Sequence, residues 1–262
     1  MKPFISPAAS KNRSLYILLF VSVLLILNGC AWLIAAPEID SAARQHLSRW
    51  TEHNAGLKQF KGRWRVQIKA EGQTLNGRAA LAGIVPDRLR VELLNTLGQP
   101  ITSLAGDGTT IRVHAVSEGR FYRWDQSGTA LERFIHVPLG IAALLEILSG
   151  RPPLPAHAAA QMSAETEDAC EIVLKDRWNN AVANLQCDGD DRIRMFQAFD
   201  IEGILQYEVH WEAWQVVAGY SLPRTVRMTS GRGDQVTWTM ERFWPDVEIP
   251  PATFVLEGAD NS

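Results

Sequence analysis

Apolar and polar residues alternate with a period of two over much of the chain. Trp64, Val66 and Ile68 alternate with polar side chains, the turn-forming sequence Glu71–Gln73 follows, and the alternation resumes as far as Leu81. This pattern predicts a β-hairpin. Further short runs of the same kind cover residues 88–93, 101–105, 110–116, 119–124, 170–174, 181–185, 193–195, 205–211, 226–228 and 236–240. Together they predict antiparallel strands with one polar and one apolar face.

Helical spacing replaces this alternation in two places. Residues 40–60 carry Ala43, Leu47 and Trp50 at intervals of three or four, which predicts a leading helix. Between the strand-like runs, residues 129–136 and the strongly apolar residues 140–148 predict a pair of short helices. Residues 154–168 are rich in alanine and proline, so we expect a loop or a weak helix there.

The order of these elements predicts an α+β fold with about ten antiparallel strands in one strongly curved sheet. We expect one domain over residues 40–262, with the helical pair at about 129–150 inserted between its strands. The apolar face of the sheet either packs as a filled core or encloses a cavity. The apolar pair of helices favours a plug or lid over an open barrel mouth.

The N-terminus predicts export. Lys2, Lys11 and Arg13 precede the uncharged run Leu15–Leu27, and this combination is typical of a secretory signal peptide. The uncharged stretch extends to Ala36, which is also long enough for a transmembrane anchor. Either alternative places the body of the protein outside the cytoplasm, attached to a membrane at its N-terminus.

The sequence L-N-G-C at positions 27–30 resembles the lipobox of bacterial lipoproteins. The resemblance implies that residues 1–29 are a lipoprotein signal peptide and that Cys30 is lipidated with diacylglyceryl and acyl chains such as palmitate. Residues 30–39 would then form a tether. Ala31, where an aspartate would retain a lipoprotein in the inner membrane, implies the outer membrane with the body facing the periplasm.

Two cysteines remain once Cys30 is assigned to lipidation. Cys170 and Cys187 flank two apolar runs joined by the turn-like sequence DRWNN, and a hairpin would place them opposite each other. An exported protein with such a pair is expected to form a disulfide. The alternative is a pair of free buried thiols.

Candidate chemistry is sparse. A formal net charge of −3 argues against a nucleic-acid partner. The chain contains no G-x-S-x-G, phosphate-binding loop or H-E-x-x-H motif, so we expect neither an enzyme nor a cofactor. His46 and His53 share a helix face without a suitably placed carboxylate, and His210 alternates outward on its strand, so we expect no metal site.

One predicted turn is unusually rich in leucine. In the stretch Leu93–Pro100, the residues Asn95, Gly98 and Pro100 mark a turn with Leu97 at its tip. Leu97 either folds back into the core or is used for contact with a partner.

Two longer stretches carry a family resemblance. RVELLNTLGQPITSLAGDG resembles the strand–loop–strand of the LolB-like outer-membrane lipoprotein receptors, and FIHVPLGIAALLEILSGRPP resembles their helical lid. The order of lipobox, helix, strands, apolar loop, lid and further strands also agrees. The resemblance covers roughly residues 40–250 and extends to uncharacterised lipoproteins of the wider LolA/LolB superfamily.

The resemblance implies an open half-barrel, with a helical lid at about residues 129–150 over a hydrophobic cavity. It also implies an outer-membrane lipoprotein that binds the acyl chains of other lipoproteins and helps insert them into the outer membrane. Its partners would be acylated lipoproteins, a LolA-like periplasmic carrier and outer-membrane lipid, and we expect a monomer. Leu97 and Leu94 would belong to the membrane-insertion loop. The cavity would be lined by Trp64, Val66, Leu81, Val91, Leu93, Leu144, Leu148, Trp211 and Trp238.

The sequence leaves two other functions open. One is a structural or assembly lipoprotein with a filled half-barrel and a protein or glycan partner. The other is a carrier or sensor of free lipid or glycolipid.

Overall fold

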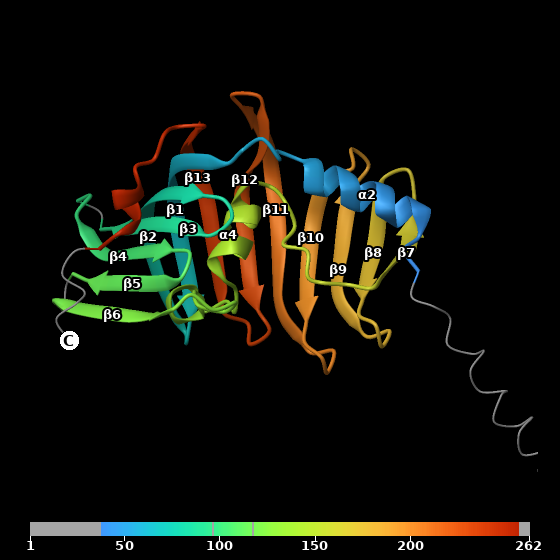
Figure 1. The fold of residues 1–262 in the computed structure, drawn as a ribbon, viewed down its shortest axis with the longest axis horizontal. Helices are drawn as coiled ribbons and strands as arrows, with labels where there is room; N and C mark the ends of the chain where they lie inside the picture. The colour runs from blue at the N-terminus through green and yellow to red at the C-terminus, as the bar shows by residue number, and fades with distance from the viewer. Residues whose placement is uncertain (1–37, 96, 117, 257–262) are drawn as a thin grey trace, which may run out of the picture. The chain divides into compact units, whose positions relative to one another are not determined.

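The structure is a computed structural model that describes residues 38–95, 97–116 and 118–256 (Figure 1). The chain divides into two units, residues 1–37 and 38–262, and the description below concerns the second. The expected signal peptide, the lipidation site Cys30 and most of the tether lie outside the described residues.

Thirteen strands of the described residues form one sheet. Its strand order is β6-β5-β4-β3-β2-β1-β13-β12-β11-β10-β9-β8-β7. The strands are β1 (Gln59–Ala70), β2 (Gln73–Ile84), β3 (Arg88–Leu94), β4 (Pro100–Asp107), β5 (Thr110–Ala115), β6 (Arg120–Asp125), β7 (Ala159–Glu165), β8 (Ala169–Lys175), β9 (Ala181–Asp188), β10 (Ile193–Phe199), β11 (Leu205–Val217), β12 (Tyr220–Ser230) and β13 (Gln235–Pro245). The helices are α2 (Ser41–Glu52), α3 (Glu132–Ile135), α4 (Ile141–Leu148) and the 3₁₀ helix η1 (Pro251–Phe254).

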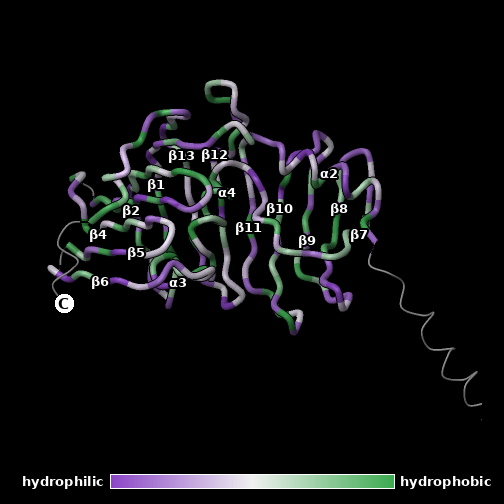
Figure 2. Tube along the Cα trace, viewed as in Figure 1, coloured by the Kyte–Doolittle hydropathy of each residue, from purple (hydrophilic) through white to green (hydrophobic). Residues whose placement is uncertain are grey.

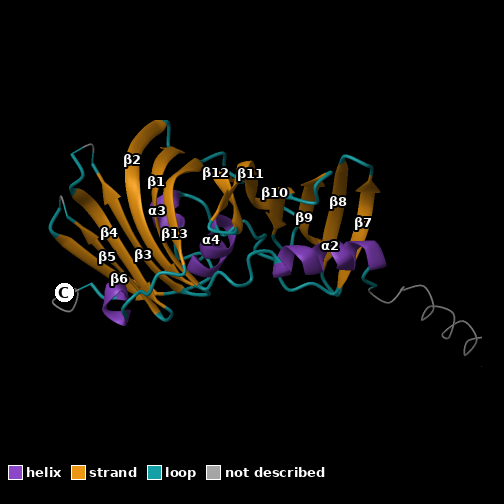
Figure 3. Ribbon diagram, turned by 90° about the horizontal axis from the view of Figure 1, so that it is seen from above, coloured by secondary structure: helices purple, strands orange, loops and turns teal. Residues whose placement is uncertain are grey.

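The connectivity explains why the sheet stays open. Neighbouring strands are antiparallel and mostly joined by hairpins, while β1 pairs with β13 near the C-terminus of the chain. The two edge strands, β6 and β7, are consecutive in sequence but lie at opposite ends of the strand order. The segment between them carries α3 and α4 across the sheet (Figure 3). The expected open, curved antiparallel sheet is confirmed, with thirteen strands where the sequence indicates about ten.

Alternation along the strands builds the core. Hydrophobic and hydrophilic positions succeed one another along most strands (Figure 2). The buried apolar residues of the strands, α2 and α4 form one large cluster. Helix α4 contributes Ile141, Leu144, Leu145, Ile147 and Leu148, all buried. At about 2 kcal/mol for each buried side chain, α4 adds on the order of 10 kcal/mol of favourable burial.

The leading helix is shorter than its spacing predicts. It ends at Glu52, and the expected helix over residues 40–60 is wrong from that point onward. Asn54 has a positive φ of 52°, and β1 begins at Gln59. Phe60 stacks on Phe243 with ring centroids 4.9 Å apart, so tertiary packing draws this segment into the sheet.

The lid region also differs from expectation. The first lid helix shrinks to the four residues of α3: residues 129–131 form a turn before it, and His136, with a φ of 56°, ends it. The second, α4, agrees with the expected residues 140–148. The expected loop or weak helix over 154–168 instead contains strand β7, in which Ala159 and Ala160 are buried against β8.

No helix in the described part of the chain combines the length and apolar character needed to cross a membrane.

Candidate functional site

An apolar cavity of about 250 Å³ lies between the first half of the sheet and the lid helices. Strands β1 to β4 and β13 form its floor, while α3, the residue before it and Leu144 of α4 form its roof. Its lining is Val66, Ile68, Leu75, Ala79, Leu89, Val91, Leu93, Thr102, Leu104, Leu131, Arg133, Phe134, Ile135, Leu144 and Trp238.

Exposure of the lining changes along the cavity. Leu89 and Leu144 are fully buried, whereas Leu93 is half-buried and Leu75 is 45% exposed. Leu75 lies near the β1–β2 turn, and Leu93 lies near the end of β3, one residue from the β3–β4 loop. Strands β1 and β3 run in the same direction, so the β1–β2 turn and the β3–β4 loop lie at the same edge of the sheet. The cavity is therefore most accessible at the edge that carries the β3–β4 loop.

The cavity has few polar groups. Trp238 belongs to the lining, and its buried indole Nε1 has no hydrogen-bond partner among the described residues, as is also true of the Nε1 atoms of Trp124 and Trp214. Leaving a buried donor unpaired is unfavourable, and such a group in a native protein calls for an explanation. A ligand with a carbonyl oxygen would supply a matching acceptor.

The nine residues expected to line a cavity divide into two groups. Five of them lie in the lining just described: Val66, Val91, Leu93, Leu144 and Trp238. The other four, Trp64, Leu81, Leu148 and Trp211, are buried outside it. Trp64 packs edge-on against Phe60, Phe243 and Trp238. Trp211 is covered by α4, and its Nε1 donates to the Ile147 carbonyl at 2.9 Å. Strand alternation identifies the correct face of the sheet but does not show where α4 fills it.

Three side chains hold α3 over the cavity. Phe134 stacks on Trp124 with centroids 5.3 Å apart, and the Arg133 guanidinium lies 5.6 Å from the Trp124 ring centroid. Arg232, in the β12–β13 hairpin, donates to Glu132 at 2.7 Å. The exposed ion pair and ring contacts are individually weak, so α3 is the most easily displaced part of the roof.

The β3–β4 loop places Leu97 in solvent. Leu97 is 82% exposed, so it does not fold back into the core. The Asn95 side-chain oxygen accepts hydrogen bonds from the N–H groups of Leu97 and Gln99 at 2.9 and 3.0 Å, and Gly98 has a φ of 81°. The backbone of Leu97 and Gln99 is thus hydrogen-bonded to Asn95 without any packing of the Leu97 side chain. Leu94 is half-buried at the end of β3, and Thr96 lies outside the described residues.

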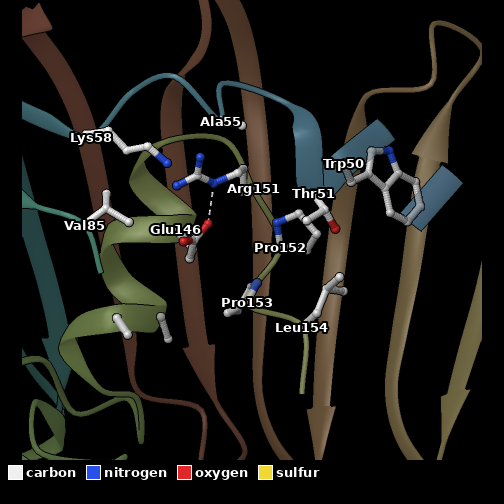
Figure 4. A pocket seen from close by; sticks show the side chains of 12 residues that line it. Trp50, Thr51, Ala55, Lys58, Val85, Glu146, Arg151, Pro152, Pro153 and Leu154 are labelled. Atoms are coloured by element: carbon white, nitrogen blue, oxygen red, sulfur yellow. Dashed lines mark hydrogen bonds and ion pairs between the residues drawn. The ribbon is translucent and has the colours of Figure 1, made fainter. Parts of the chain in front are cut away.

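A larger hollow of about 540 Å³ lies on the other side of α4 (Figure 4). It contains the ion pair between Glu146 and the buried Arg151, whose Nη1 also donates to the Asn54 carbonyl at 2.9 Å. Asn54 in turn donates to the Ser149 and Ser221 carbonyls at 2.9 and 2.7 Å. These polar contacts join the end of α4 to the α2–β1 connection. Despite its volume, we interpret this hollow as structural, because Glu146 and Arg151 are already paired with each other and with the Asn54 backbone.

The same junction holds His53. Its Nε2 lies 2.9 Å from the Ser221 carbonyl, and its ring packs edge-on against Trp214. Burial lowers the pKa of His53, the Ser221 carbonyl partly opposes this change, and the nearby charge of Arg151 lowers the pKa further.

Cys170 and Cys187 form a disulfide with an S–S distance of 2.12 Å, directly opposite each other on β8 and β9. His46 of α2 lies beside them, and its Nδ1 pairs with Asp191. Because the two sulfurs are bonded to each other, they offer no thiolate to a metal. His210, expected on the outward face, is partly exposed and pairs with Glu208 on the same strand.

The open sheet, the helical lid and the apolar cavity define a LolA-like fold. Comparison with solved structures supports this fold class. Similar structures include a LolA superfamily protein from Nitrosomonas europaea, with a TM-score of 0.53 and 12% identity over 82% of this chain and 97% of that one. A DUF1329 family protein from Desulfovibrio piger has a TM-score of 0.58 and 11% identity over 83% and 98% of the two chains. A putative outer membrane lipoprotein-sorting protein domain from Vibrio parahaemolyticus has a TM-score of 0.54 and 10% identity over 81% and 96%.

At such low identity these similarities concern the fold alone. No protein-family model matches the chain, and no curated protein matches its sequence.

Proposed function

We propose that this protein is an outer-membrane lipoprotein that binds the acyl chains of other lipoproteins and helps insert them into the outer membrane. The observation that carries the proposal is an apolar cavity, roofed by a four-residue helix, that is most accessible at the edge bearing the exposed Leu97. The LolA-like fold supports it.

The cavity suits a hydrocarbon chain. Burying an acyl chain contributes about 0.8 kcal/mol for each CH₂ group, so an aliphatic and aromatic lining binds it without covalent chemistry. The free N–H of Trp238 would donate to the ester or amide carbonyl of an acylated cysteine. This activity requires no catalytic residue and no cofactor.

Loading requires movement of the lid. At about 250 Å³ the closed cavity is smaller than the roughly 300–1,000 Å³ of typical ligand pockets. A complete acyl chain therefore requires α3 to swing away from Trp124 and Arg232. The contacts that hold α3 are weak enough for bound hydrocarbon to displace them.

Delivery is assigned to the β3–β4 loop. Leu97 is exposed on the hydrogen-bonded β3–β4 loop at the accessible end of the cavity, where it would enter the bilayer while cargo leaves. Lipidation of Cys30 would hold the domain at that membrane. The partners would be a LolA-like carrier and its acylated cargo.

A transfer assay tests the proposal. The body after Cys30 is mixed with a carrier protein loaded with an acylated lipoprotein, and cargo is followed first to the body and then to liposomes. We expect both the native body and Leu97→Glu to accept cargo, and only the native body to deliver it. Transfer to neither would favour a structural or assembly lipoprotein, an alternative that the limited volume of the cavity supports.

A further inference from the structure

Four hairpin loops of the sheet share one geometry. In each, an Asn or Asp side-chain oxygen accepts hydrogen bonds from the backbone N–H groups two and four residues later, at 2.8 to 3.1 Å. The residue three positions later always has positive φ, between 59° and 81°. The loops are Asn95–Gln99, Asp176–Asn180, Asp188–Arg192 and Asp200–Ile204.

The loops differ in what they display. Three lie at the same edge of the sheet, because β3–β4, β8–β9 and β10–β11 connect strand ends on that side. Each of the three carries a large exposed apolar side chain: Leu97, Trp178 or Ile201. The fourth, between β9 and β10 at the opposite edge, displays Asp190 and Arg192 instead. Among these four loops of the same geometry, only the three at one edge of the sheet therefore display a large apolar side chain.

Two of the apolar loops are close neighbours. Trp178 is 66% exposed and Ile201 is 87% exposed, and Ile204 beside it is more than half exposed. Their hairpins are two strand spacings apart, or roughly 10 Å. The Arg177 guanidinium lies 3.9 Å from the Trp178 ring centroid. A tryptophan beside a basic group is typical of residues at a membrane–water interface. The two loops project side by side below β8–β11 in Figure 1.

The chain enters the domain at this same edge. Ile39 forms a parallel bridge with Ala160, at the start of β7, and the Glu38 carbonyl accepts from the Ala160 N–H at 3.3 Å. On the adjacent strand β8, Lys175 lies opposite Ala159, and its carbonyl accepts a hydrogen bond from the Ala158 N–H at 2.8 Å. The Trp178 loop begins directly after Lys175. Because the bridge is parallel, Glu38 lies on the loop side of Ile39.

Chain length limits how far this edge lies from the N-terminal attachment. The eight steps from Cys30 to Glu38 span at most about 28 Å when fully extended. An uncleaved apolar segment ending at Ala36 would leave only two steps. Under either form of attachment, the short tether keeps Glu38, and with it the start of β7 beside the Trp178 loop, within reach of the bilayer.

We propose that the loops carrying Trp178, Ile201 and Ile204 form a second membrane-contacting patch, separate from the Leu97 loop on the same edge of the sheet, which rests on the same bilayer that holds the N-terminal segment. The inference depends on the membrane attachment included in the proposed function, but not on cargo binding or on Leu97. It orients the domain with this patch toward the lipid surface.

Lipid photocrosslinking of the full chain tests this orientation. The protein is reconstituted into phosphatidylethanolamine–phosphatidylglycerol vesicles that contain a phosphatidylcholine with a diazirine in its acyl chain. Vesicles are isolated by flotation and irradiated, and the modified peptides are mapped by mass spectrometry. We expect adducts at 176–180 and 200–204, and none at the geometrically equivalent loop 188–192.

A matched pair of variants sharpens the result. Ile201→Glu should lower adduct formation at residues 200–204 by about tenfold, because a charged tip is excluded from hydrocarbon. Val216→Glu makes the same kind of change at an exposed apolar residue near the opposite edge and should leave the adducts unchanged. Melting temperatures of both variants confirm that they are folded.

The alternative outcomes separate the two proposals. Adducts confined to the Leu97 loop, or equal labelling of loop 188–192, overturn the second membrane-contacting patch and leave cargo binding intact. Adducts at 176–180 and 200–204 in a protein that accepts no acylated cargo support the patch and overturn the proposed function. A full chain that fails to float overturns both.

Discussion

The Glu132 carboxylate accepts a hydrogen bond from the Arg232 guanidinium at 2.7 Å, and this ion pair links the lid helix α3 to a hairpin one hundred residues away. Both groups are solvent-accessible, so the pair contributes little to global stability. Its position matters more than its strength, because α3 is the smallest element of the cavity roof.

Removing this link should ease opening of the lid. We expect Arg232→Ala to change the free energy of unfolding by less than about 0.5 kcal/mol while increasing the association rate of a fluorescent fatty acid severalfold. Stopped-flow fluorescence gives the rate. Arg192→Ala, which removes a comparable exposed pair with Asp190 far from the lid, is the control. Equal rates in the two variants would show that α3 does not control entry.

The unpaired N–H of Trp238 should matter only when a ligand is bound. Trp238→Phe removes a buried donor that lacks a partner, so we expect it to lower the free energy of unfolding only through the smaller ring, and by less than a Trp→Phe change that also removes a hydrogen bond. Affinity for an acyl ester should fall about tenfold, since a hydrogen bond to its carbonyl is lost. Affinity for an alkane probe of equal length should change much less. Calorimetric titration with the two ligands separates these effects.

Trp211→Phe is the matched control for that experiment. Its Nε1 already donates to the Ile147 carbonyl, so the same substitution should destabilise the protein by about 1 kcal/mol. Its effect on the two ligands should be equal. If Trp238→Phe behaves like Trp211→Phe, the Trp238 donor has no role in ligand binding.

The fold is predictable wherever a local pattern and tertiary packing agree. The alternation around Trp64 predicts β1, and the turn at Glu71 is where the hairpin reverses. Strand β7 escapes prediction because only Ala159 and Ala160 of its residues are buried, which leaves no apolar alternation to detect. The helical spacing places the end of α2 too late in the chain. Phe60 belongs to β1 because it stacks on Phe243, and this contact between distant residues cannot be read from the spacing.

The site is only partly predictable for the same reason. Val66 and Trp64 share one face of β1, but Val66 lines the cavity while Trp64 is packed among aromatic rings. The difference depends on which helix or side chain covers each position, which is a nonlocal property. The unpaired Nε1 of Trp238 likewise has no sequence signal. Leu97 is the reverse case, since an apolar side chain at the tip of a polar turn is conspicuous in the sequence itself.

The disulfide should stabilise the half of the sheet that α2 covers. Cys170 and Cys187 are 17 residues apart, and closing a loop of that size stabilises a folded protein by about 3 kcal/mol in the chain-entropy treatment. We expect the double variant Cys170→Ala/Cys187→Ala to unfold at a correspondingly lower urea concentration. Native protein under reducing conditions should match the variant. Alkylation followed by mass spectrometry confirms the state of the thiols, and an unchanged midpoint would show that the bond contributes nothing.

The half-buried His53 at the α2–β12 junction should make stability depend on pH. Burial lowers the pKa of His53 in the folded protein below the value of about 6.5 expected for the unfolded chain. Between these two pKa values the unfolded state binds more protons, so stability rises with pH there. The contribution of His53 is complete above about pH 6.5 and is lost as the pH falls through the folded-state pKa.

His53→Gln isolates this contribution. Glutamine retains a donor for the Ser221 carbonyl but does not titrate in this range. We expect urea midpoints of the native protein to fall more steeply below about pH 6.5 than those of the variant, with the two curves running parallel above it. The Glu208 pair with His210 is unchanged in both proteins and cancels from the comparison. Parallel curves over the whole range would show that His53 carries the same charge in the folded and unfolded states, and would contradict the burial argument.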